Sequence, residues 1–295
     1  MQMISSRGYQ LGLNVFMALL ALATVFPFIL LVSGSLTSDT ELLQTGYAII
    51  PKEINFTAYE FLWNDAADIG RAYGITILVT LIGTAVGLTI IALLAYPLSR
   101  QEMPFRNFLA FFVFFTMLFN GGLVPTYLVY TNLFDVKNSL WALIVPGLLV
   151  NAFYVIIMRT FFATSIPGAI IESAYMDGAK EFRIFISIVL PLSTPVLATV
   201  GLFQTIHYWN DWFNGLIYIT DSRFYSLQNM LNRILLDVQF LQTSQDNVAS
   251  SITSDIPLKS MRMAMAAIGV IPIIIAYPFF QKYFIKGITI GAVKG

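Results

Sequence analysis

The side chains best suited to binding chemistry gather in one short stretch, Gln204 to Trp212, at the end of an apolar run. The stretch reads QTIHYWNDW and joins aromatic rings to amides, a carboxylate and the one histidine of the chain. Sugars are held by that combination, because an aromatic ring packs on the C–H face of a pyranose while amides and carboxylates pair with its hydroxyls. With two amides from other apolar runs, the candidate residues for contact with a polar solute are Asn120, Asn151, Gln204, His207, Tyr208, Trp209, Asn210 and Asp211.

Other kinds of site lack the residues they need. The chain has no cysteine and one histidine, so neither thiolates nor a histidine cluster can hold a metal ion. The GxxxxGK[ST] loop that cradles nucleotide phosphates is absent, and no HExxH, Ser-His-Asp or paired-carboxylate pattern is visible. Lys and Arg number 16 against 16 Asp and Glu, which leaves no basic stripe for nucleic acid. We expect no catalytic residue, no metal, no cofactor bound by this chain and no nucleic-acid partner.

The elements that must position these residues are membrane helices. Of the 295 residues, 57% are hydrophobic and only 11% are charged, which is far from the composition of a soluble domain. A helix needs about 20 mostly apolar residues to cross a bilayer, and on that criterion we expect an all-α membrane protein with about six spans. The expected spans are Leu11 to Val32, Tyr73 to Tyr96, Phe105 to Tyr130, Leu140 to Phe162, Pro195 to Ile219 and Met261 to Ile285. We treat residues 1–295 as a single transmembrane domain.

A polar loop, residues 164–194, lies between the fourth and fifth expected spans and must face water. We expect a helix from about Ile166, with Ser165 as its N-cap and Pro167 in its first turn. Gly178 interrupts the helical pattern, and Pro191 ends the loop where the next span begins. One apolar face of small and aromatic residues is expected to consist of Ala174, Tyr175, Gly178, Ala179 and Phe182.

Two features of the spans suggest close packing. Gly83 and Gly87 lie four apart and offer a close-approach face, which makes packing against another subunit plausible there. Prolines inside spans free backbone carbonyls that neighbouring helices or cavity water must satisfy. The prolines concerned are Pro97, Pro125, Pro146, Pro272 and Pro278. For Trp209 and Trp212, an aromatic belt at the outer interface is favoured over contact with a solute.

The external segments are expected to be partly helical. Thr37 to Ala72 reads as short helices against the membrane, and the loop at about 220–260 has apolar residues at helical spacing from Leu227 to Val238. Gln242 to Asp255 reads as a polar loop. This external loop is either a docking place for a partner or a solvated connector.

Orientation follows from the positive charges, which are more frequent in short cytoplasmic loops. With both termini inside, the cytoplasmic Lys and Arg are Arg7, Arg100, Arg106, Arg159, Lys180, Arg183, Lys282, Lys286 and Lys294. The remaining ones are fewer and are spread over longer loops. We therefore expect both termini in the cytoplasm.

The polar loop resembles the EAA loop of permease subunits in bacterial ABC importers. The positions that match its Glu, second Ala, Gly, Ile, Leu and Pro are Glu172, Ala174, Gly178, Ile188, Leu190 and Pro191. Ser173 stands where the family often has Ala. Phe185, Pro195 and Asp177-Gly178-Ala179 are common in the sugar-uptake branch. Further similarity lies in GGLVPTYLVY, Asn151-Ala152-Phe153, Tyr208-Trp209-Asn210 and the closing GITIGAVKG.

The resemblance implies a MetI-like fold and the second permease subunit of an oligosaccharide importer of the maltose, alginate or aldouronate type. It implies a heterodimer with a related permease, two cytoplasmic ATPase subunits that bind ATP and Mg, an extracytoplasmic solute-binding protein, and a place in the bacterial cytoplasmic (inner) membrane. The residues it implies for coupling to the ATPase are Glu172, Ala174, Asp177, Gly178, Ala179 and Pro191.

The preferred function is import of oligosaccharides, and acidic oligosaccharides are the preferred class among them. Two alternative functions remain. The first is an ABC permease for a non-sugar solute, because the EAA spacing marks the superfamily rather than the substrate. The second is an ATP-independent secondary transporter or channel. A secondary transporter is expected to bury ionisable residues in mid-span for ion coupling. Apart from Asp211, near the end of a span, this sequence has almost none.

Overall fold

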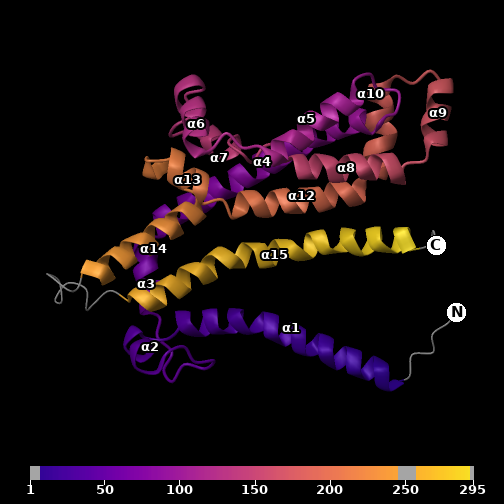
Figure 1. Cartoon of the computed structure of the whole chain (residues 1–295). Coiled ribbons are helices and arrows are strands. Elements are labelled where there is room, and N and C mark those ends of the chain that lie inside the picture. The colour runs from indigo at the N-terminus through magenta and orange to yellow at the C-terminus, as the bar shows by residue number, and fades with distance from the viewer. Residues whose placement is uncertain (1–6, 245–256, 293–295) are drawn as a thin grey trace. The chain divides into compact units, whose positions relative to one another are not determined.

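The computed structural model describes residues 7–244 and 257–292, and every regular element in these ranges is a helix (Figure 1). The chain divides into two compact units, one of Met1–Asp68 with Arg233–Pro272 and one of Ile69–Asn232 with Ile273–Gly295. The expected all-α class is confirmed for the described residues. The single domain stays a prediction.

The first unit contains α1 (Arg7–Ser35), the short helices α2 (Asp39–Thr45) and α3 (Thr57–Asn64), and the start of α15 (Leu258–Ala292). The short helices expected between Thr37 and Ala72 are thereby confirmed. The Asp39 carboxylate accepts hydrogen bonds from the backbone N–H groups of Lys259 and Ser260, both at 2.8 Å. These are first-turn donors of α15 that have no partner within the helix, so Asp39 fixes the start of α15 to α2.

In the second unit four long helices run alongside one another (Figure 1). They are α4 (Ala66–Ser99), α5 (Arg106–Leu118), α8 (Ala152–Ser165) and α12 (Thr194–Trp209). One end of this bundle carries α9 (Gly168–Met176) and α10 (Glu181–Ile184). The other end carries α6 (Leu123–Leu128), the π-helical turn η1 (Val129–Leu133), α7 (Trp141–Ile144) and α13 (Phe213–Tyr218). The polar loop and the interrupted parts of the spans therefore lie at opposite ends.

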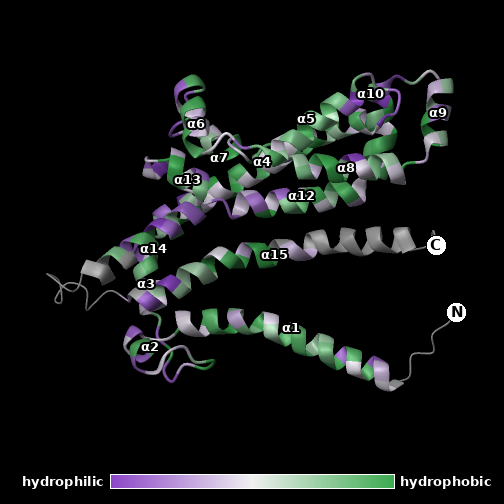
Figure 2. Ribbon diagram, in the orientation of Figure 1, coloured by the Kyte–Doolittle hydropathy of each residue, from purple (hydrophilic) through white to green (hydrophobic). Residues whose placement is uncertain are grey.

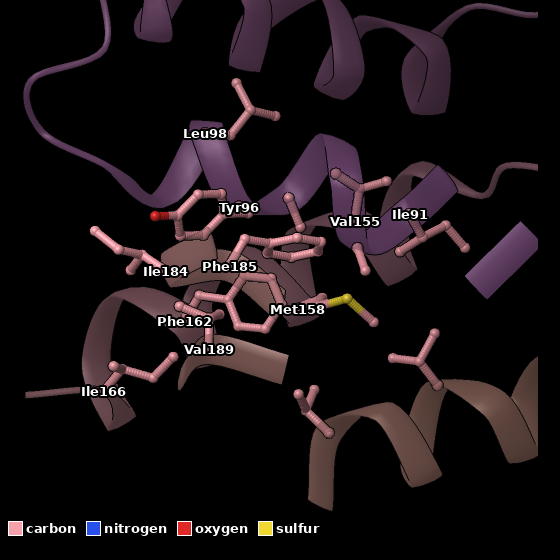
Figure 3. Packing of buried hydrophobic residues seen from close by; sticks show 14 of the residues in the cluster. Ile91, Tyr96, Leu98, Val155, Met158, Phe162, Ile166, Ile184, Phe185 and Val189 are labelled. Carbon is pink, nitrogen blue, oxygen red and sulfur yellow. The ribbon is translucent and has the colours of Figure 1, made fainter. Parts of the chain in front are cut away.

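The main core of this unit joins the helices at the loop end (Figure 3). The Tyr96 ring lies 5.0 Å from that of Phe185 and 6.5 Å, edge-on, from that of Phe162. Side chains from α4, α8, α10 and the segment after α10 interlock there. They include Ile91, Leu98, Val155, Met158, Ile184 and Val189, all at most 1% exposed.

Two helices, α1 and α4, are each long and apolar enough to cross a membrane, as expected for the first two spans (Figure 2). Three pairs of bent helices raise the number to as many as five within the described residues. The expected sixth span lies in α15, whose side chains from residue 279 onward are not described, and residues 293–295 of the closing motif lie outside the described ranges. The count of six stays a prediction.

Three expected spans are interrupted rather than continuous. The third breaks at 119–122, where Gly122 has φ +87°, and α5 and the helix after it are bent by 113°. The fourth is irregular from 145 to 150, where Pro146 cannot donate and Gly147 has φ +72°. The fifth stops at Trp209, and α13 begins only at Phe213. The expected spans were identified from the length of their apolar runs. Length and apolar character alone do not predict where the helices are interrupted.

The segment after the bundle includes η3 (Ser222–Phe224) and α14 (Leu227–Ser244), which confirms the helical spacing from Leu227 onward. α14 extends three residues, 242 to 244, into the stretch expected as a polar loop. The rest of that stretch, up to Asp255, lies outside the described residues.

Candidate functional site

The polar loop opens with a sharp turn between α8 and α9, which are bent by 76°. α9 starts at Gly168, two residues later than expected, and its N-cap is Pro167 rather than Ser165, with no side-chain cap. The reason is that the residue before a proline avoids the helical region. Ile166 accordingly has φ −97° and ψ 116° and closes α8.

The end of α9 is fixed by Gly178, as expected. Its φ is +76°, a conformation that glycine adopts without the cost of a Cβ. The Gly178 N–H donates to the Tyr175 carbonyl and the Ala179 N–H to the Ala174 carbonyl, both at 2.9 Å. These two bonds around a left-handed residue form a Schellman motif. The turn is therefore a property of the local sequence.

The expected apolar face of the loop divides into two parts. Ala174 is 7% exposed and packs with Ala179 against the core of the same chain. Tyr175 and Phe182 are 41% and 66% exposed. The small residues thus hold α9 onto the bundle, and they are not the surface that α9 offers to a partner.

The surface that α9 leaves exposed contains Glu172, Met176 and Asp177. Met176 is 89% exposed. Glu172 also lines a cavity of about 270 Å³ with Gly168, whose other wall includes Arg100. α9 is thus anchored on one side and open, with two carboxylates and an apolar tip, on the other.

Glu181, which the sequence did not single out for a role, links three elements at this end. One carboxylate oxygen accepts from the Tyr96 hydroxyl of α4 at 2.5 Å, and the other accepts from the Tyr175 hydroxyl of α9. Because Glu181 starts α10, both arms of the loop are fixed to the end of α4. No local pattern distinguishes this glutamate from the other charged residues of the loop.

After α10 the chain stays helical through the π-helical turn η2 (Phe185–Val189) and α11 (Leu190–Leu192). Pro191 has no N–H, and the π turn directly before it, closed by the Leu190 N–H on the Phe185 carbonyl, widens the helix there. The helix then bends by 80° into α12 at Ser193. Pro191 therefore stands where the loop meets the fifth span, as expected.

The candidate solute contacts on α12 and in the turn that follows it face in two directions. His207, Asn210 and Asp211 line an open hollow of about 490 Å³ together with Tyr154 and Trp212. The aromatic and polar side chains of this hollow are the combination that the sequence suggested for a sugar.

The remaining candidates on α12 turn into the protein. Gln204, Tyr208 and Trp209 are 0%, 3% and 7% exposed. The Gln204 amide donates to the Leu148 carbonyl at 2.7 Å, and the Tyr208 hydroxyl to the Ile144 carbonyl at 2.9 Å. Asn214, which no pattern in the sequence singles out, is buried as well and donates to the Pro146 carbonyl at 2.8 Å.

The two asparagines outside α12 lie at helix starts. The Asn120 side chain accepts from the Gly122 N–H at 2.8 Å, next to the break before α6. The Asn151 side chain accepts from the Phe153 N–H at 2.9 Å as the N-cap of α8. Each has a structural role at a break in an apolar run.

Gly83 and Gly87 pack against this chain and not, as suggested, against another subunit. A Cβ on Gly83 would lie 2.4 Å from the Tyr208 ring, and one on Gly87 would lie 2.7 Å from both the Gln204 amide nitrogen and the Leu149 carbonyl oxygen. The glycines are needed because α12 and the irregular segment press directly on α4.

Comparisons with known proteins match this architecture over nearly its whole length. The family model of the binding-protein-dependent transport system inner membrane component matches residues 1–290. Protein LplC of Bacillus subtilis (strain 168) is 38% identical over 272 residues, covering 92% of this chain and 90% of that protein. The polygalacturonan/rhamnogalacturonan transport system permease protein YtcP of the same organism is 36% identical over 292 residues, covering 99% and 100%.

A solved structure is also similar. It is a chain from the crystal structure of a bacterial ABC transporter involved in the import of the acidic polysaccharide alginate. The TM-score is 0.79 at 30% sequence identity, and the match covers 96% of this chain and 99% of the other. The arrangement of helices is therefore that of a transporter permease.

Proposed function

The chain belongs to the family of binding-protein-dependent transport system inner membrane components, and from that premise we propose how it works as a permease of an ABC importer for oligosaccharides. The end-to-end likeness to a permease of an alginate importer is the observation that carries this function. The permease is a transport subunit and not itself an enzyme. It works with a related permease, two ATPase subunits and an extracytoplasmic binding protein.

We propose that α9 is the contact with the ATPase. Glu172, Met176 and Asp177 form its exposed surface, while Ala174 and Ala179 hold it to the bundle. Cytoplasmic ATPases must reach this surface, so the α9 end of the second unit lies on the inner side. Both termini are placed in the cytoplasm by the distribution of Lys and Arg along the sequence. ATP and Mg bind to the partner and not to this chain.

We propose that the substrate is an acidic oligosaccharide. Two proteins that are similar over almost the whole chain carry acidic polymers in their names, polygalacturonan and alginate. The hollow beside α12 offers His207, Asn210 and Asp211 next to aromatic rings, and its amide and carboxylate groups suit sugar hydroxyls. A relative that is 28% identical is named for arabinooligosaccharides, which makes neutral sugars the class to test against.

The test is uptake into liposomes that contain this permease with its partner permease and ATPase, supplied with the binding protein. Oligogalacturonate and a neutral arabino-oligosaccharide of the same length are compared with and without ATP. We expect ATP-dependent uptake of the acidic sugar. Uptake of the neutral sugar alone would overturn the acidic class, and ATP-independent uptake of either would overturn the importer.

A further inference from the structure

Three buried side chains after the loop donate hydrogen bonds to alternate carbonyls of the irregular segment 145–150 and the residue before it. The acceptors are every second residue, from Ile144 at the end of α7 through the turn at Pro146 to Leu148. The pairs are Tyr208 hydroxyl to Ile144 at 2.9 Å, Asn214 amide to Pro146 at 2.8 Å and Gln204 amide to Leu148 at 2.7 Å.

The bonds answer a need that the sequence creates. Pro146 and Gly147 break the helix, so the carbonyls before and after them are without helical partners. An unpaired buried carbonyl costs about 1–3 kcal/mol, and irregular backbone at membrane depth is tolerated only where protein or water satisfies it. The three donors are themselves at most 7% exposed, so each bond pairs a buried donor group with a backbone carbonyl. The other amide atom of Gln204, Oε1, is buried without a hydrogen-bond partner among the described residues.

The packing of α4 leaves little space for these hydrogen-bonded groups to move apart. α4 closes over them with glycine at Gly83, against the Tyr208 ring, and at Gly87, against the Gln204 amide. Neighbouring atoms would meet a Cβ at both positions. The packing therefore favours one arrangement of α12 on the irregular segment.

The order of the elements along the chain shows which helices these hydrogen bonds connect. The irregular segment continues directly into α8, and α8 leads into α9. α12 in turn leaves the loop at Ser193. α8 and α12 are thus joined through the loop at one end and through the Gln204 and Tyr208 bonds at the other. The Asn214 bond adds α13, the helix that follows α12.

We propose that Gln204, Tyr208 and Asn214 are positioning residues that make α8 move as one rigid body with α12 and with the start of α13 when the loop is displaced. This inference rests on the proposed function, because the displacing force is that of the ATPase. Motion that starts at α9 then reaches the hollow beside α12 without being lost in sliding between the two helices.

The test uses the reconstituted importer with Gln204→Met, Tyr208→Phe, Asn214→Leu and the triple variant. Each change removes a donor and keeps a similar volume. We expect sugar transported per ATP hydrolysed, at saturating sugar, to fall about threefold to tenfold in single variants, as expected for the loss of one buried hydrogen bond. The KM for sugar should stay unchanged. A rise in KM with normal transport per ATP would indicate a sugar contact and overturn the positioning role.

Thr199→Val is the matched control on the same helix. The Thr199 hydroxyl is partly buried, but it donates within α12 to the Pro195 carbonyl at 2.8 Å. It therefore makes no hydrogen bond to the irregular segment 145–150. The control should transport like the wild type. Tyr208→Phe keeps its ring against Gly83, so this variant remains informative if the triple variant fails to assemble.

A distance measurement decides the question independently of transport. The chain has no cysteine, so in complexes made with cysteine-free partner subunits spin labels on Phe153→Cys of α8 and Thr194→Cys of α12 report on these two helices. We expect one narrow distance in nucleotide-free and vanadate-trapped complexes, and a broader one after adding Tyr208→Phe. An equally narrow distance in both backgrounds would overturn the proposal. If the wild type takes up no sugar, the proposed function fails. The distances still test whether the three hydrogen bonds hold α8 and α12 together.

Discussion

The two ends of the second unit hold the same helices together in different ways. At the loop end, the Schellman turn at Gly178 is local, and the exposed surface of α9 remains free for a partner. At the other end, buried donors reach carbonyls more than fifty residues away in sequence, with Gln204 bonding Leu148 across 56 positions. The turn between α9 and α10 is set locally, and the bond from the Tyr96 hydroxyl to the Glu181 carboxylate then fixes this turn to α4. The far end, in contrast, depends on every long-range pair being made.

The largest effect is expected where the far end is tightest. Gly83→Ala places a Cβ 2.4 Å from the Tyr208 ring, whose hydroxyl is held by Ile144. Overpacking of this kind costs about 1–3 kcal/mol. The thermal midpoint of the purified complex should fall clearly. Gly74→Ala on the same helix, where a Cβ meets nothing within 4 Å, should leave the midpoint unchanged or raise it. Equal midpoints for the two variants would mean that α4 does not press on α12.

A smaller effect is expected at the loop end from Glu181→Gln. The amide retains one acceptor oxygen, so one of the hydroxyls of Tyr96 and Tyr175 loses the oxygen to which it donates. A lost hydrogen bond to a charged group costs about 1.5–3 kcal/mol when buried and less here, because Tyr175 is exposed. Protease accessibility of the loop should increase. Glu102→Gln, which removes only the 3.6 Å surface pair with Arg100, should not change it. Equal digestion rates in the two variants would rule out the Glu181 link.

The smallest effect is expected from Asp221→Asn, outside the bundle. Hydrogen bonds from Arg223 hold the pKa of the Asp221 carboxyl below its usual range. The charged form therefore contributes stability above the unfolded pKa of about 3.9, and this contribution is lost as the pH falls through the lower folded value. At pH 7 the thermal midpoint of the variant should be slightly below that of the wild type. In strong acid the two midpoints should be equal. A difference that grows on acidification would contradict this sign.

The loop end could be predicted from the sequence because its signals are local. Gly178 has a positive φ and marks the end of α9, and Pro191 marks the end of the loop. Both of these positions could be recognised in the sequence. The start of α9 was placed wrongly at Ile166, since the effect of Pro167 on the residue before it outweighs the capping tendency of Ser165.

The far end could not be predicted in the same way. Pro146-Gly147 looked like a proline tolerated inside a span, because the carbonyls it frees find their donors only after folding. Gln204 and Tyr208 are polar residues in an apolar run, which equally suits contact with a sugar and a bond to the backbone. Glu181 lacked any signal, because its partners Tyr96 and Tyr175 come from separate helices.

The central claim is that α9 receives the force of the ATPase, and it is tested most directly in the reconstituted importer with Glu172→Lys and Gly178→Trp. Glu172→Lys reverses a charge on the exposed surface of α9, and Gly178→Trp forces a side chain into a conformation at φ +76°. Gly168→Ala, whose Cβ would meet only the Glu172 carboxylate at 3.9 Å, is the control. We predict insertion into the membrane for all three, and loss of sugar-stimulated ATP hydrolysis and uptake in the first two alone. Normal assembly with full stimulated turnover and uptake in both would contradict the claim.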